Sequence, residues 1–128
     1  MSDPFLAALG LAASGMRAQG TRIRVVAENV ANAGAAGFRR KQVTFNEIRH
    51  GDDAHPVRRV FLDQTPLQRV HDPAHPQADA AGYVELSNVN PLIELADLQE
   101  ARRSYEAGLA AFDQARDLYK RTLDLLRR

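Results

Sequence analysis

Two clusters of histidine and aspartate are the groups of this sequence that could bind a metal ion. One cluster comprises His71, Asp72 and His75, and the other comprises His50, Asp52, Asp53 and His55. Imidazole and carboxylate groups are common zinc ligands, but neither cluster has the recurring ligand spacing of a zinc site. Both clusters lie in polar stretches that contain proline, where exposed histidine and aspartate are expected anyway. We therefore predict no metal site and no cofactor.

Motifs typical of enzymes do not occur in the sequence. The chain contains no cysteine, which excludes disulfides, thiolate metal sites and cysteine nucleophiles. It has no phosphate-binding glycine loop, no nucleophile elbow and no paired histidines at helical spacing. We predict no catalytic residues and a role that is not enzymatic.

The charge of the chain is nearly balanced. Seventeen Lys and Arg residues against 16 Asp and Glu residues give a net charge of +1, too little to make a phosphate backbone the obvious partner. The basic run at residues 39–41, beside Phe38, could contact nucleic acid, but a short solvated turn is the simpler interpretation. We predict no nucleic-acid partner.

The N-terminal residues do not resemble a cleaved secretion signal, which has a basic region, an apolar core and a cleavage site. No stretch approaches the roughly 20 apolar residues that a membrane-spanning helix needs. We expect a protein that is not inserted in a membrane, and that is either cytoplasmic or exported without cleavage.

A long helix is predicted over most of residues 1–34. Asp3 and Pro4 form a typical helix start, with a capping carboxylate before a proline at the first helical position. Apolar residues then recur at alternating steps of four and three, the spacing of a coiled-coil seam. The positions of this seam are Phe5, Leu9, Ala12, Met16, Gln19, Ile23, Val26 and Val30. The pattern ends near Asn32, and Gly34 could cap the helix.

A second long helix is predicted over residues 90–128. Asn90 and Pro91 repeat the start signal, and the same steps of four and three follow to the end of the chain. The positions of this seam are Leu95, Leu98, Arg102, Tyr105, Leu109, Phe112, Arg116, Tyr119, Leu123 and Leu126. The two arginines could pair with acids of a neighbouring helix and set its register, or their stems could pack while their heads reach water.

Three glycines, Gly10, Gly15 and Gly20, lie inside the first helix. Each costs about 1 kcal/mol relative to alanine, so this helix should be marginal alone. With the nearby alanines they could form a thin surface that another helix approaches closely. The first helix could therefore become ordered only on assembly, although pairing within one chain is also common.

The middle segment, residues 35–89, lacks the heptad pattern. Short runs rich in β-forming residues at 43–48, 57–62 and 83–86 predict two or three short strands, and residues 72–82 read as an extended loop. The expected fold is mainly α, with long N- and C-terminal helices packed as a coiled coil and a small β-containing middle segment.

Several short motifs resemble those of the flagellar rod and hook protein family. They are AENVAN at residues 27–32, GFRRK at 37–41, DPAHP at 72–76, GYV at 82–84, NVN at 88–90 and ARRSYEA at 101–107. The residues of these motifs that we single out are Asn29, Asn32, Gly37, Phe38, Asn88 and Asn90. The resemblance as a whole covers nearly the whole chain. The chain departs from the family at Ala35 and Ala36, where threonine and proline are frequent.

The short length and the middle motifs are most similar to the C-type subunits of the proximal rod, with B-type subunits as the nearest alternative. The resemblance implies a structural subunit of the basal-body rod, which crosses the periplasmic space. It also implies export without cleavage through the flagellar type III apparatus, and terminal helices that pack together and against other rod subunits. Phe5 and Leu9 resemble the residues linked to recognition by the export gate. A cytoplasmic helical-hairpin adaptor or chaperone remains an alternative.

Overall fold

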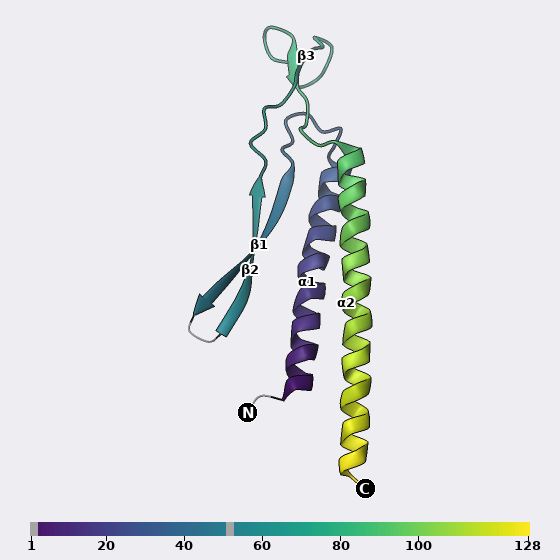
Figure 1. The fold of residues 1–128 in the computed structure, drawn as a ribbon. Helices are drawn as coiled ribbons and strands as arrows, with labels where there is room; N and C mark the ends of the chain where they lie inside the picture. The colour runs from purple at the N-terminus through teal and green to yellow at the C-terminus, as the bar shows by residue number, and fades with distance from the viewer. Residues whose placement is uncertain (1–2, 51–52) are drawn as a thin grey trace.

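The computed structural model describes residues 3–50 and 53–128, with side chains described outside residues 46–58. Two helices, α1 (Pro4–Ala31) and α2 (Pro91–Leu126), run antiparallel along one another (Figure 1). At about 1.5 Å per residue they are roughly 42 and 54 Å long. The chain is mainly helical, with two long terminal helices and small antiparallel sheets between them, as the sequence predicted.

The helix starts follow the predicted capping signals. The Asp3 carboxylate accepts a hydrogen bond from the Phe5 amide at 2.9 Å, and the Asn90 side chain accepts one from the Leu92 amide at 3.1 Å. Proline occupies the first turn of each helix, where its missing amide hydrogen would have no partner anyway.

The predicted cap at Gly34 was wrong. The C-cap of α1 is Asn32, whose amide donates to the Glu28 and Asn29 carbonyls while its side chain donates to the Glu28 carbonyl at 2.8 Å. This asparagine satisfies the last carbonyls of the helix, so no left-handed residue is needed there. Positive φ angles occur instead at Gly37 and Gly82 within the described residues.

In the described residues between the helices, four strands form two separate hairpins. The long hairpin pairs β1 (Lys41–His50) with β2 (Asp53–Leu62), in a register that places Lys41 opposite Leu62 and Val43 opposite Val60. The short hairpin pairs β3 (Arg69–His71) with β4 (Tyr83–Glu85). The prediction of two or three short strands was therefore wrong in number and length, because β1 and β2 are longer than expected and β3 was missed.

The two hairpins occupy different places. The long hairpin lies beside α1 and diverges from it toward the hairpin tip, whereas the short hairpin projects beyond the end where α1 stops and α2 starts (Figure 1). Few described side chains are fully buried: the apolar Val25, Val26, Val84 and Ala101, and the polar Asn29 and Glu94. Most of this small core lies where α1, β1 and α2 meet.

Candidate functional site

The interface between α1 and α2 is built on small residues of α2. Ala101 is completely buried, and Gly108, Ala115 and Thr122 follow it at intervals of seven. A Cβ atom at Gly108 would lie 3.0 Å from Cγ of Met16, closer than an ordinary contact. Gly108 therefore permits the close approach of the two helices.

The glycines of α1 are not approached closely by another helix within the described chain. A Cβ atom at Gly10, Gly15 or Gly20 would meet nothing within 4 Å. No other part of the described chain approaches these positions closely.

The predicted seam of α1 faces α2 along most of its length. Val26 is buried, and Phe5, Leu9, Met16 and Ile23 are partly buried. The rings of Phe5 and Tyr119 meet edge to face, with centroids 6.2 Å apart. Val30, the last seam position, is exposed.

The predicted seam of α2 divides into two lines. Leu98, Phe112 and Tyr119 are partly buried along the interface, and Tyr105 of the same line is 39% exposed. The second line is turned outward, and all its members are exposed: Leu95, Arg102, Leu109, Arg116 and Leu123. Leu126, the last position of the first line, is also exposed. The face of α2 that meets α1 therefore contains the first line and the small residues, and only half of the predicted seam lies in this interface.

The two arginines of the exposed line do not set the register of α1. The Arg116 guanidinium lies 3.4 Å from the Asp113 carboxylate and 3.9 Å from the Asp117 carboxylate, both on its own helix. Arg102 is exposed. Among the described residues, neither arginine forms an ion pair with an acid of α1.

Two asparagines hold the base of the long hairpin. Asn29 of α1 donates to the Lys41 carbonyl at 2.8 Å and accepts from the Lys41 amide at 2.9 Å, as a neighbouring strand would. Asn88, just before α2, accepts from the Arg40 amide and donates to the carbonyls of Asp63 and Thr65 at 3.1 and 3.2 Å. Each side chain replaces backbone partners at the edges of β1 and β2.

A buried carboxylate joins the same region to α2. Glu94 has no exposed surface, and it accepts from the Arg40 side chain and from the Asn29 amide group, the latter at 3.2 Å. Arg40 also pairs with Asp97 at 3.2 Å and with Asp63 at 3.7 Å. A buried charge is tolerated only when it is paired and hydrogen-bonded, and Arg40 meets that need. The predicted solvated turn at residues 39–41 was therefore wrong.

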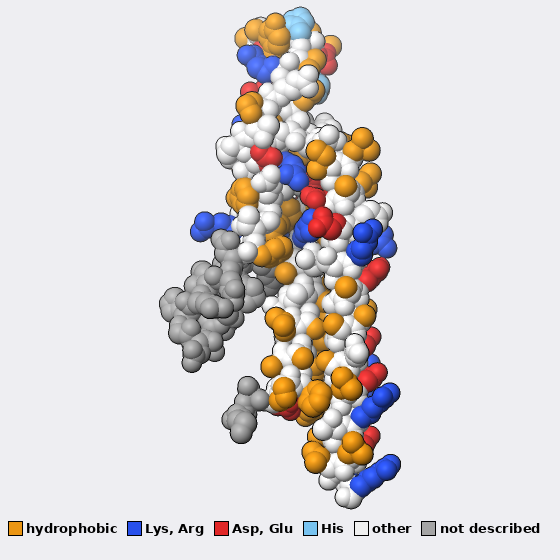
Figure 2. All heavy atoms as spheres, viewed as in Figure 1, with side chains coloured by type: hydrophobic (Ala, Val, Ile, Leu, Met, Phe, Trp, Pro, Cys, Tyr) orange, Lys and Arg blue, Asp and Glu red, His pale blue; other side chains and the backbone are white. Residues whose placement is uncertain are grey.

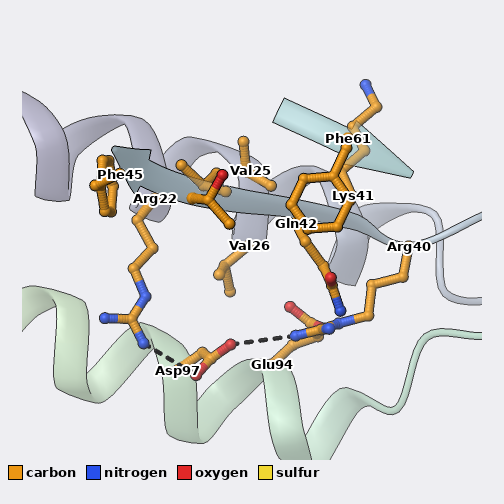
Figure 3. A pocket seen from close by; sticks show the side chains of 12 residues that line it. Arg22, Val25, Val26, Arg40, Lys41, Gln42, Phe45, Phe61, Glu94 and Asp97 are labelled. Carbon is orange, nitrogen blue, oxygen red and sulfur yellow. Dashed lines mark hydrogen bonds and ion pairs between the residues drawn. The ribbon is translucent and has the colours of Figure 1, made fainter. Parts of the chain in front are cut away.

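The ion pairs continue along α1. Arg22 lies 3.1 Å from Asp97 and 3.3 Å from Glu100. Figure 3 shows Arg22 and Arg40 reaching toward Asp97 from two different parts of the chain. These side chains line a solvent-open cavity of about 330 Å³ between β1 and the helices, together with Val25, Val26, Phe45 and Phe61 among others.

The other motif residues determine the path of the chain near the point where α1, β1 and α2 meet. Asn32 and Asn90 cap the two helices. Gly37 has a φ of 77°, which an L side chain rarely adopts, and its amide donates to the Glu85 carbonyl at 2.8 Å. Phe38 follows this turn and is partly buried. The structure thus brings the singled-out motif residues to one end of the helix pair.

Three carboxylates among the described residues have lowered pKa values. Hydrogen bonds from the Thr65 side chain and amide, with Arg40 nearby, lower the pKa of Asp63. The Lys41 ammonium lowers the pKa of Glu28, and the Tyr83 and Ala81 amides lower that of Asp79.

The two described histidines of the candidate metal clusters, His71 and His75, make local contacts. His71 ends β3 and packs against the Tyr83 ring at 5.0 Å, and the His75 ring accepts a hydrogen bond from the Gln77 amide at 3.0 Å. No three His, Asp or Glu side chains converge on a common point among the side chains that the structure describes. The side chains of His50, Asp52, Asp53 and His55 lie outside the described residues.

Sequence reasoning missed the importance of Arg40, Glu94, Ala101 and Gly108. Glu94 stood in the first turn of α2, where a carboxylate normally favours the helix dipole from the surface, so nothing marked it as buried. Gly108 and Ala101 did carry a signal, because small residues every seventh position line a close interface. Large apolar residues at heptad spacing do not include these small positions.

This chain is similar to known flagellar rod proteins. The family model described as "Flagellar basal body rod FlgEFG protein C-terminal" matches residues 80–125. The flagellar basal-body rod protein FlgC of Agrobacterium fabrum is 44% identical over 135 residues, covering 98% of this chain and 97% of that protein. The FlgC proteins of Aquifex aeolicus and Salmonella typhimurium are each 35% identical, covering 91% and 90% of this chain and 93% and 92% of their own lengths. None of these three relatives is a B-type rod protein or a cytoplasmic adaptor. No helix of the described residues is long and apolar enough to cross a membrane.

Proposed function

Because this chain belongs to the FlgC family of flagellar basal-body rod proteins, and is a structural subunit of that rod, we propose that it assembles through the outward-facing line of α2. That line is the half of the predicted seam left exposed by α1. It carries Leu95, Leu109 and Leu123, which are 48%, 44% and 39% exposed. Apolar residues aligned on one face and open to water are typical of an interaction surface.

The first half of α1 supports the same proposal. Residues 4–16 contain no charged side chain, and Leu6 and Leu11 are 54% and 77% exposed. Figure 2 shows hydrophobic side chains gathered over the lower half of both helices, with charged side chains along the outer edge of α2. Such a surface is suited to burial against neighbouring helices, and we expect other rod and basal-body proteins to be its partners.

Under this proposal the chain has three functional parts. Residues 1–34 and 90–128 are the assembly helices, and residues 35–89 form the segment between them. The packing residues are those of the two predicted seams, with Arg102 and Arg116 placed to meet acids of a neighbour. Assembly by packing requires no catalytic group, and we propose that the subunit is not an enzyme.

We also propose that Phe5 and Leu9 serve in export through the flagellar type III apparatus before the subunit reaches the periplasm. Phe5 contacts Tyr119 in the folded chain. The pair would therefore be free for the export gate only while α1 is separated from α2. The same residues would serve recognition first and packing afterwards.

The test is complementation of a flagellated bacterium that lacks its own FlgC. The unaltered chain should restore motility and appear in purified basal bodies. A Phe5→Ala, Leu9→Ala variant should accumulate in the cytoplasm, whereas the matched Leu6→Ala, Leu11→Ala variant should still be exported. Cytoplasmic retention of both variants, or of neither, would contradict the export proposal. A well-expressed and exported chain that never enters the rod would contradict the assembly proposal.

A further inference from the structure

One face of α1 is covered at one end only. Leu11, Ala18 and Val25 are seven residues apart and so lie on the same side of the helix. Leu11 is 77% exposed, whereas Val25 is 3% exposed. Val26, one residue later and about 100° around the helix, belongs to the seam with α2. The long hairpin lies beside this end of α1 and diverges from the other (Figure 1). Its residues Val43, Phe45 and Phe61 line one cavity with Val25, so we infer that the hairpin covers Val25.

The apolar contact beneath the hairpin is incomplete. Val25 lines the open cavity with Val43, Phe45 and Phe61 (Figure 3). Phe45 and Phe61 remain 40% and 39% exposed. A two-stranded hairpin is at best marginally stable alone, and this one has limited apolar burial against the helices. Its position therefore depends on the polar contacts at its base.

Those polar contacts come from both helices. The hairpin side supplies Arg40 and the Lys41 backbone, α1 supplies Asn29, and α2 with the residues before it supplies Glu94 and Asn88. We call Asn29, Arg40, Asn88 and Glu94 the latch. Neither helix alone can complete the latch.

The helix pair does not depend on the latch in the same way. Away from the hairpin, α1 and α2 meet through the buried Ala101, the close contact of Gly108 with Met16, and the rings of Phe5 and Tyr119. These contacts contain no residue of the long hairpin. The dependence between the two units should therefore run in one direction.

We propose that the latch makes seating of the long hairpin conditional on pairing of the helices. When α1 and α2 pair, Asn29 and Glu94 come together and hold the hairpin over Val25. When the latch is broken, the hairpin leaves Val25 while the helices stay paired. This is a property of the single chain and does not rest on the proposed function.

The absence of native cysteine allows a direct test by thiol labelling of the purified chain. A Val25→Cys variant reports whether the hairpin is seated, and an Ala101→Cys variant reports whether the helices are paired. Both thiols should be protected at neutral pH. If the Ala101→Cys thiol reacts as fast as an unfolded peptide, the helices are not paired and the proposal is wrong.

Breaking the latch should then separate the two thiols. With Arg40→Gln added, labelling of the Val25→Cys thiol should accelerate by about tenfold or more, because losing one partner of a buried pair leaves the other charge unsatisfied. Labelling of the Ala101→Cys thiol should change by less than about twofold, because Ala101 lies outside the latch and separate sites behave independently. Glu94→Gln, which changes the shape of the side chain less, should have the same effect on the two thiols. Arg59→Gln, which replaces an exposed arginine of the same hairpin, should change the labelling of neither thiol.

The reverse perturbation tests the direction of the dependence. A Gly108→Leu variant, whose side chain would collide with Met16, should separate the helices and expose both thiols. Acceleration of both thiols by Arg40→Gln and Glu94→Gln, or protection of the Val25→Cys thiol in Gly108→Leu when the Ala101→Cys thiol reacts, would overturn the proposal.

Discussion

Glu94 illustrates how one side chain can join three parts of the chain. It lies in the first turn of α2 and has no exposed surface, and its partners are Asn29 of α1 and Arg40 before β1. A buried ion pair contributes little net stability compared with a well-packed apolar group, whereas the loss of one partner is costly. Glu94 therefore serves to specify that α1, α2 and the segment before β1 meet at this point.

Gln19 differs from Glu94 because its buried polar atom is not hydrogen-bonded. It occupies a seam position of α1, and its buried side-chain oxygen has no hydrogen-bond partner. Such an unsatisfied group costs about 1 to 3 kcal/mol. We predict that Gln19→Leu raises the free energy of unfolding by about 1 kcal/mol, measured by urea denaturation. Gln99→Leu, at an exposed position of α2, should have little effect, and equal gains from both would argue against a specific cost at Gln19.

The lowered pKa values of Asp63, Glu28 and Asp79 predict a loss of stability in acid. A carboxylate whose pKa is lower in the folded chain binds fewer protons there than when unfolded, so it stabilises the fold above its unfolded pKa. That contribution disappears as the pH falls from about 4 through the lower folded values. Thermal unfolding between pH 7 and pH 2.5 should show a falling midpoint below about pH 4.

Asp63→Asn is the matched variant for this effect. It removes one titrating group and should make the midpoint fall less steeply in acid, while lowering it at pH 7. A variant that follows the same acid profile as the unaltered chain would show that Asp63 does not contribute.

The elements differ in how well their sequence predicts them. Both helix starts could be predicted because an Asp-Pro or Asn-Pro pair satisfies specific end groups of a helix. The three-residue strand β3 could not, since Arg69, Val70 and His71 form no alternating pattern long enough to recognise. Its pairing with β4 depends on residues more than ten positions later. The end of α1 was misplaced because Asn32 caps it by a side-chain contact.

The helix interface shows a second limit of local patterns. Large apolar residues at steps of three and four identified the helices and the seam of α1. In α2 they identified two lines, of which only one lies at the interface. The choice between lines depends on how closely the backbones approach, and Gly108 and Ala101 decide that by their small size. The latch was not predicted either, since it joins residues up to 65 positions apart.

The two halves of α1 should differ in stability. Val25, Val26 and Asn29 are buried near its C-terminal end, whereas residues 4–16 contain no buried side chain. Gly10 and Gly15 also cost about 1 kcal/mol each in this half. We predict faster amide exchange over residues 4–16 than over residues 22–31 in the free chain, measured by hydrogen-deuterium exchange with mass spectrometry.

Alanine at the two glycines provides the control. A Cβ atom at either position meets nothing within 4 Å, so Gly10→Ala, Gly15→Ala should slow exchange over residues 4–16 without disturbing the interface. Uniform protection along α1 in the unaltered chain would contradict the prediction.

At the scale of the whole molecule, few of the described side chains are buried, and long apolar faces are open to water. We predict that Leu109→Lys, Leu123→Lys abolishes concentration-dependent association, measured by sedimentation velocity, and blocks incorporation into basal bodies. Because both leucines are already exposed in the single chain, its helix content and unfolding temperature should change little.

A leucine on the other flank of α2 serves as the comparison. Leu118 is 47% exposed and lies outside the Leu95–Leu109–Leu123 line, so Leu118→Lys should leave association largely intact. Equal loss of association in both variants would indicate a general need for apolar surface.

The contact of Phe5 with Tyr119 also fixes how far the helices overlap. Helix α1 begins beside this contact, whereas α2 continues past it to Leu126 (Figure 1). At the opposite extremity the short hairpin caps the pair, so the two ends of the subunit have different chemistry. Copies arranged along a common axis must then share one orientation for unlike ends to meet. An array built in this way has polarity, and its two tips are not equivalent sites for the addition of the next subunit.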